Sequence, residues 1–159
     1  MKKQKLSHYN SAGSVSMVDV SSKAVTSRTA IARAYVAMPK EAIAALPQNK
    51  KGDPLEIARI AGIVAAKKTA ELIPLCHQLP LSHVAVEFSL DAKGIEITAS
   101  ARTVAQTGVE MEAMTAAAVA ALTIYDMTKA LSKAIEIREI HLLEKTGGKS
   151  GHFKRKKTK

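Results

Sequence analysis

Apolar and polar residues alternate along four segments of the chain, and alternation of this kind predicts β-strands. The pattern is weak over residues 26–38 and stronger over residues 84–90 and 95–102. The Asp-Ala-Lys-Gly connector at 91–94 separates the two stronger segments, which are therefore expected to form a β-hairpin. A last strand is predicted for residues 135–143, where Ile and Leu mix with charged residues.

Two longer segments predict helices on either side of the hairpin in sequence. Asp53 can cap the first helix, with Pro54 at its first position, and the helix is expected to continue until Pro74 ends it. Its many small residues would let another element approach closely. The second helix is predicted for residues 109–132, and a short helix is expected after Pro39.

The resulting order of elements is β-α-β-β-α-β. It predicts an α+β fold of the ferredoxin-like type, in which one antiparallel sheet carries two long helices on one face. With 159 residues the chain fits one domain, expected at residues 17–151. The polar residues 1–16 are predicted to form a flexible arm, and residues 152–159 a flexible basic tail.

Composition narrows the functional classes. The single cysteine, Cys76, excludes an intramolecular disulfide and a metal site built of cysteines alone. The five histidines show no metal-ligand spacing, so neither a metal nor another cofactor is expected. No apolar run approaches the roughly eighteen residues of a membrane span, and no apolar signal segment follows the N-terminal lysines. These features predict a cytoplasmic protein without a membrane partner.

The net charge of +10 is concentrated at the two ends of the chain. Ten of the 24 basic residues lie in residues 2–5 and 145–159, and the other 14 balance the 14 acidic residues of the body. Such a terminal lysine run is usually a solvated tail. The alternative is an RNA-binding module of the same fold, which would present aromatic residues on its sheet. The predicted strands hold only Tyr35 and Phe88, and Phe88 is on the apolar face, so no nucleic-acid partner is expected.

Cys76 and His77 are adjacent in a loop between Pro74 and Pro80. Neighbouring residues rarely point the same way, so Cys76 is interpreted as a small buried side chain rather than a nucleophile. His77 lies in a rigid loop directly after a helix, which makes it a candidate to bind a ligand, with a purely structural role equally open.

Asp126 and Lys129 lie about one turn apart on the second long helix. An ordinary surface ion pair is the commoner explanation of this spacing. The surrounding sequence is largely apolar, however, and a pair buried there would be a candidate for proton transfer. Burial raises the pKa of a carboxylate and lowers the pKa of a lysine, which brings both closer to neutral pH.

The final loop contains Gly-Gly-Lys-Ser at residues 147–150. It is not a P-loop, because Leu143 stands where that motif needs a glycine. Its backbone N–H groups and the flanking Lys145 could still bind an anion, and Lys51 lies in another glycine-containing loop. A flexible basic segment is the alternative.

Five blocks of the sequence together resemble the cyclic pyranopterin monophosphate synthases, the type C proteins of molybdenum cofactor biosynthesis. The blocks are MVDVSSK at 17–23, KGD at 51–53, ARIAGIVAAKKTAELIPLCHQLPLSHV at 58–84, TGVEMEAMTAAAVAALTIYDMTKA at 107–130 and GGKSG at 147–151. The sequence departs from the family pattern at Gln78, Lys68 and Thr128, where proline, arginine and cysteine are expected. The last departure argues against an obligatory thiol at that position.

The resemblance implies a lyase that converts (8S)-3′,8-cyclo-7,8-dihydroguanosine 5′-triphosphate, a purine-nucleotide-derived substrate, into cyclic pyranopterin monophosphate and diphosphate. It implies that Asp126 and Lys129 form an acid–base pair, with Lys51 as a third catalytic residue. The residues that it implies for substrate binding are Leu75, Cys76, His77, Glu110, Met111, Glu112, Arg28 and Lys145. It also implies a homohexamer, a trimer of dimers with active sites at subunit interfaces.

Overall fold

The computed structural model describes residues 8–9 and 12–156 of the chain. Its strands are β1 (Thr26–Ala37), β2 (Leu81–Asp91), β3 (Gly94–Ala105), β4 (Glu136–Thr146) and β5 (Phe153–Lys154). Its helices are α1 (Lys40–Ala44), the 3₁₀ turn η1 (Leu46–Gln48), α2 (Pro54–Lys67), α3 (Thr69–Leu72) and α4 (Glu110–Thr128). None of these helices is long and apolar enough to cross a membrane. The predicted arm and tail lie partly outside the described residues.

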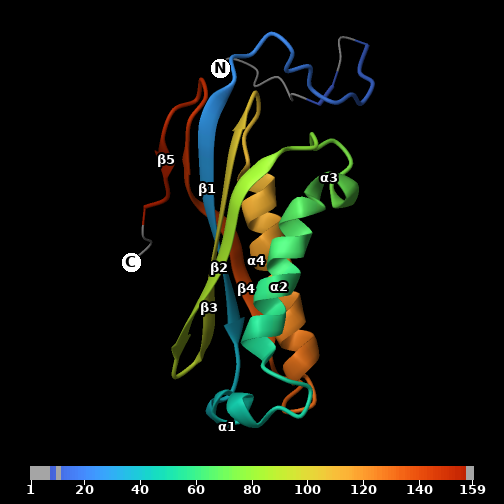
Figure 1. Ribbon diagram of the computed structural model, residues 1–159. Helices are drawn as coiled ribbons and strands as arrows, with labels where there is room; N and C mark the ends of the chain where they lie inside the picture. The colour runs from blue at the N-terminus through green and yellow to red at the C-terminus, as the bar shows by residue number, and fades with distance from the viewer. Residues whose placement is uncertain (1–7, 10–11, 157–159) are drawn as a thin grey trace.

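The described strands form one sheet in the order β2-β3-β1-β4-β5, and every neighbouring pair is antiparallel. The long helices α2 and α4 lie side by side on one face of this sheet (Figure 1). The predicted α+β fold of the ferredoxin-like type is therefore confirmed, including the hairpin of β2 and β3, which lies at one edge of the sheet. The short strand β5 is an addition that the sequence pattern did not predict, and it pairs with the outer edge of β4.

Small residues let the helices and the sheet approach closely. The core-facing positions of β1 and β3 are fully buried and include Ala30, Ala32, Ala34, Val36, Ile95, Ile97, Ala99 and Ala101. Alanines also cover the buried side of α4. At Gly62 of α2, an added Cβ would lie 2.9 Å from the backbone oxygen of Ala116, so only glycine fits this crossing without a shift. The expected close packing of the small-residue helix is confirmed.

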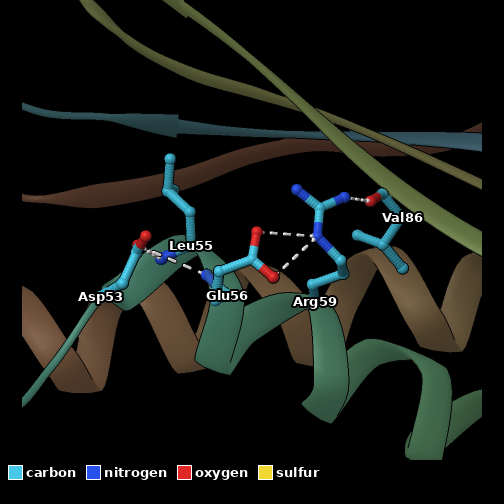
Figure 2. A network of polar contacts seen from close by, with 5 residues as sticks. All are labelled: Asp53, Leu55, Glu56, Arg59 and Val86. Atoms are coloured by element: carbon cyan, nitrogen blue, oxygen red, sulfur yellow. Dashed lines mark hydrogen bonds and ion pairs between the residues drawn. The ribbon is translucent and has the colours of Figure 1, made fainter.

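Asp53 begins α2 as the sequence predicts. Its Oδ1 accepts hydrogen bonds from two backbone N–H groups of the first turn, at 2.9 and 3.4 Å (Figure 2). Glu56 pairs with Arg59 at 3.1 Å, and Arg59 donates to the backbone oxygen of Val86 on β2. The Arg59 guanidinium also lies 5.1 Å from the centre of the Phe88 ring. These contacts tie the start of α2 to the edge strand β2.

The prediction of one continuous helix from Pro54 to residue 73 is wrong. α2 ends at Lys67, Lys68 leaves the helical conformation with φ −107° and ψ 11°, and α3 adds one further turn. The buried hydroxyl of Thr69 donates to the backbone oxygen of Ala66 at 3.0 Å, a local bond that competes with regular helical hydrogen bonding. The break redirects the chain before Pro74 and so sets where the following loop lies.

Two other element ends differ from the prediction. α4 stops at Thr128, four residues early, and the buried Thr128 hydroxyl donates to the backbone oxygen of Ile124 at 2.6 Å. β4 runs to Thr146 and is irregular, because its register against β1 shifts twice and Glu139 has a φ of +57°. Alternation of residue types cannot show such bulges, since each one inserts an extra residue into the pattern.

Candidate active site

The predicted site residues divide between the two ends of α4. Eight of them lie at or near its N-terminal end, and Lys51, Asp126 and Lys129 lie at its C-terminal end. Glu112 and Asp126 are fourteen residues apart on this helix, a separation of about 21 Å at 1.5 Å per residue. A single chain therefore does not bring all of the predicted residues together.

A cavity of about 380 Å³ lies beside the N-terminal end of α4. Volumes of about 300–1,000 Å³ are typical of small-molecule sites. The cavity is bounded by the loop after α3, the first turn of α4 and the segment that precedes β1. Its described lining residues are His8, Val18, Val20, Lys23, Ile73, Leu75, Cys76, His77, Leu79, Thr107, Gly108, Glu110, Met111 and Glu112. Six of the eight predicted binding residues are therefore in its wall.

The loop after α3 brings Leu75 and Cys76 to this wall. The Cys76 N–H donates to the backbone oxygen of Ile73 at 3.0 Å and so closes a turn around Pro74. Burial raises the pKa of the Cys76 thiol, and the nearby charge of Glu112 raises it further. A thiol with a raised pKa is a poor nucleophile at neutral pH, which argues against a nucleophilic role. The Cys76 side chain was predicted to be buried and is partly buried.

His77, in the same loop, faces the segment that precedes β1. Its Nε2 lies 2.8 Å from the backbone oxygen of Val18. A carbonyl oxygen can only accept a hydrogen bond, so Nε2 carries the hydrogen. In a neutral imidazole Nδ1 is then the acceptor, and the backbone of Val18 selects both the tautomer and the orientation of the ring.

Glu112 lies on the first turn of α4 and is only 4 % exposed. It is the one charged residue that is buried among the residues that the structure describes. Burial raises its pKa to about 7, its own backbone N–H opposes this rise, and the neighbouring charge of Glu110 adds to it. Near neutral pH Glu112 can therefore either donate or accept a proton.

Two basic residues and the glycine loop form a polar group next to the cavity. Arg28 donates to two backbone oxygens at the end of β3, at 3.0 and 3.1 Å. Gly148 has a φ of +71° and passes so close to Arg28 that a side chain there would collide with the guanidinium. Lys145 donates to the Ser150 hydroxyl and lies 3.8 Å from the carboxylate of Glu110, which reaches the cavity. Arg28 of β1 and Lys145 of β4 thus place positive charge beside the cavity wall, next to the glycine loop.

Lys51, Asp126 and Lys129 form the second group. Lys129 Nζ lies 2.6 Å from Asp126 Oδ1, and Lys51 Nζ lies 3.5 Å from the Asp126 backbone oxygen. Asn49 donates to the backbone oxygen of Met127 at 2.9 Å and so holds the loop that carries Lys51 against the helix. The sequence left open whether Asp126 and Lys129 form a buried pair or a surface pair, and in this chain they form a surface pair.

The surface pair has a different electrostatic character from a buried one. The Asp126 side chain is 62 % exposed and that of Lys129 52 % exposed, because it is the side of α4 with Ala120, Ala121 and Ile124 that is buried. Their mutual hydrogen bond and charge attraction lower the pKa of Asp126 and raise the pKa of Lys129. Both are therefore charged at neutral pH in the single chain, the opposite of the pKa shifts that burial would cause.

The aromatic residues of the predicted strands do not form a platform for bases. On the open sheet face, Tyr35 donates to the carboxylate of Asp91 at 2.8 Å and lies under Arg33, 5.7 Å from the ring centre. Arg33 itself pairs with Glu96 at 2.6 Å. Phe88 lies on the helix-covered face, against Arg59. The arrangement therefore does not favour the RNA-binding alternative.

Several cavity residues had no role assigned from the sequence, notably Val18, Val20 and Lys23. The only signal was their presence in the MVDVSSK block at 17–23, since so short a segment does not indicate where it crosses the fold. Within the described part of the chain, no group of three His, Cys, Asp or Glu side chains is arranged to hold a metal ion.

Comparisons with known proteins place the chain in a family. Residues 17–148 match the MoaC family. The chain is 55 % identical over 152 residues to the cyclic pyranopterin monophosphate synthase of Dinoroseobacter shibae, covering 93 % of this chain and 96 % of the relative. It is 54 % identical to the synthase of Chloroflexus aurantiacus and 56 % identical to that of Bordetella avium, with 94 % of each chain covered in both cases. The chain therefore belongs to the MoaC family.

Proposed function

We propose that this chain catalyses the reaction for which its relatives are named, the synthesis of cyclic pyranopterin monophosphate. The substrate is the cyclised dihydroguanosine triphosphate, and diphosphate is released, so the enzyme is a lyase of molybdenum cofactor biosynthesis. The observation that carries this proposal is the buried Glu112 at the base of a 380 Å³ cavity, with Arg28 and Lys145 beside it. Such a cavity suits a polar heterocycle that carries phosphates.

The cavity end of α4 binds the substrate. Glu112, with a pKa near neutral, exchanges hydrogen bonds with the heterocycle in either protonation state, while Met111 and Leu75 supply apolar contact. His77 presents Nδ1 as an acceptor because its Nε2–H is held by Val18. Glu110 connects this wall to Lys145, which with Arg28 offsets the negative charge of the phosphates.

The other end of α4 supplies proton transfer. Conversion of a triphosphate into a cyclic monophosphate requires a hydroxyl of the same molecule to replace diphosphate on the α-phosphorus. The hydroxyl loses a proton, and the leaving diphosphate needs positive charge nearby. Asp126 is the base, Lys129 is the acid of the pair, and Lys51 lies close enough to stabilise the developing negative charge.

Because the two ends are about 21 Å apart in one chain, a complete site combines the cavity of one chain with the Asp126 group of another. The exposed apolar residues Ile57, Ile60 and Val64 recur at helical spacing on α2 and support association. The assembly is a homohexamer, a trimer of dimers, as the family resemblance implies. The compartment is the cytoplasm, and neither a metal nor a nucleic acid takes part.

The direct test is to measure diphosphate release from the purified cyclised nucleotide. The wild-type protein should release one diphosphate per cyclic monophosphate formed. A matched assay with GTP, which lacks the additional ring bond, should release none. A protein that binds the cyclised nucleotide tightly but releases no diphosphate under any assembly state would refute the proposed activity.

A further inference from the structure

The segment that precedes β1 crosses the cavity as an extended strap. We define the strap as residues 17–23. Its side chains alternate, with Val18 and Val20 partly buried and lining the cavity, and Met17 and Asp19 exposed. Figure 1 shows the N-terminal segment at the same end of the molecule as α3. The strap is therefore one wall of the substrate cavity and is not part of the sheet or of a helix.

Two side-chain hydrogen bonds fasten the strap to the rest of the protein. His77 Nε2 donates to the Val18 backbone oxygen at 2.8 Å, and Gln106 Nε2 donates to the Ser21 backbone oxygen at 3.2 Å. His77 follows α3 and Gln106 follows β3, so both fastenings come from loops that themselves border the cavity. None of the residues from 17 to 23 is fully buried, so little packing opposes release of the strap.

A turn inside the strap brings Lys23 back to the cavity. The Lys23 N–H donates to the Val20 backbone oxygen at 2.9 Å, and Asp19 Oδ1 accepts from the Ser21 N–H at 2.9 Å. Lys23 is the only lysine among the described residues that line the cavity, and Glu110 and Glu112 line the same cavity. A ligand with several phosphates needs such a cation when it enters beside two carboxyl groups.

We propose that the strap is a lid that closes over the bound substrate, that His77 is its latch, and that Lys23 is a further residue that binds the triphosphate. His77 can hold the strap and bind the substrate at the same time. Its Nε2–H bonds to the strap, and its Nδ1 is left as an acceptor for the substrate. The part of this proposal that concerns Lys23 rests on the proposed function. The latch does not, since it depends only on the contact between His77 and Val18.

The latch is tested without any ligand by hydrogen exchange of the strap amides, followed by mass spectrometry of the full-length protein. In His77→Gln the side-chain amide nitrogen can occupy the position of Nε2 and donate to Val18. In His77→Asn the amide nitrogen corresponds in reach to Nδ1 and cannot. We expect His77→Asn to raise exchange in residues 17–23 roughly tenfold and His77→Gln to stay close to wild type. Equal exchange in all three proteins, or equal loss in both variants, would overturn the latch.

The lid and Lys23 are tested with GTP as a stable purine triphosphate. Binding of GTP to the wild-type protein should slow exchange in the strap, and Lys23→Ala should weaken the affinity about tenfold while Lys23→Arg retains most of it. Lys93→Ala, in the distant hairpin turn, is the matched control and should bind like wild type. Unchanged affinity in Lys23→Ala would remove Lys23 from the site, and GTP binding without slower strap exchange would refute the lid. If the wild-type protein fails to bind GTP, the substrate class is wrong, while the ligand-free comparison still decides the latch.

Discussion

At the scale of single residues, Glu112 couples the chemistry of the cavity to the stability of the fold. Its carboxyl has a pKa of about 7 in the native chain against 4.5 in the unfolded chain, so between these values the native state holds more protons. Stability therefore falls as the pH rises from about 4.5 to about 7, and full stability from this group is present only below about 4.5.

Glu112→Gln should remove this dependence. The difference between a pKa of 4.5 and one of about 7 corresponds to on the order of 3 kcal/mol in the free energy of unfolding. The variant should therefore be more stable than wild type by up to about that amount at pH 8, and nearly as stable as wild type at pH 4. Urea unfolding at several pH values measures this difference in stability, and a Glu87→Gln variant, at an exposed position, serves as the control. A Glu112→Gln protein whose stability follows the same pH curve as wild type would contradict the assigned burial of charge.

The turnover of the Glu112→Gln variant should fall, because the carboxyl can no longer exchange a proton.

Asp126 and Lys129 carry the second residue-scale prediction. Asp126→Asn and Lys129→Ala should each lower turnover about 10²-fold or more, since general acid–base groups contribute about 10²–10⁴. Both side chains are more than half exposed, so the fold should survive, which circular dichroism checks. Cys76→Ser is the contrasting variant and should keep substantial activity, because the thiol has a raised pKa. A folded Asp126→Asn or Lys129→Ala enzyme with near-normal turnover would exclude that residue from catalysis.

At the scale of elements, the C-terminal part of the chain contains two different parts, the end of β4 with Lys145 beside the cavity and the edge strand β5. Lys145 lies near the cavity through Glu110, whereas β5 covers the outer edge of β4, with Lys154 3.4 Å from Glu144 and Arg155 donating to the Leu142 backbone oxygen at 2.8 Å. These latter contacts are exposed and contribute little. Changes at Lys145 and in β5 should therefore affect turnover differently.

Removal of residues 154–159 should leave turnover nearly unchanged, whereas Lys145→Ala should raise the KM several-fold with a smaller effect on kcat. The reason is that Lys145 adds charge beside the cavity, while the contacts of Lys154 and Arg155, among the described residues that are removed, are with β4. Steady-state kinetics of both variants measure these changes in KM and kcat. A large loss of activity on trimming the tail would show that its basic residues belong to the site.

At the scale of the whole molecule, the separation along α4 predicts complementation between inactive variants. Glu112→Ala and Asp126→Ala should each be inactive. When they are unfolded and refolded together, random pairing makes half of the dimers mixed, and each mixed dimer regains one of two sites. About a quarter of wild-type activity should return, as measured by diphosphate release. Mixed oligomers that remain inactive would rule out a site shared between chains.

Much of this protein follows from local sequence patterns. Alternation predicts β1, β2 and β3, because one face of each strand is buried and side chains alternate between faces. The start of α2 follows from Asp53 and Pro54, since a cap and a fixed φ act within one turn. The residues themselves point to His77, Asp126, Lys129 and the lysines beside the glycine loops, and the family blocks supply the other site residues and the roles. The cavity gathers six of the eight predicted binding residues.

Other features depend on contacts between segments distant in sequence, and only the tertiary structure decides them. The predicted helix 54–73 breaks at Lys68, next to Thr69, whose buried hydroxyl bonds to the Ala66 backbone oxygen. β4 bulges at Glu139, where its register against β1 shifts, and the pattern of one strand alone does not show how it pairs with another. Near Asp126, Ala121 and Ile124 face the core, and the ion pair is left exposed, since a helix in contact on one side buries only that side. Val18 contacts His77 across 59 positions of sequence. Burial gives Glu112 a pKa of about 7, and burial depends on what surrounds a side chain and not on its neighbours along the chain.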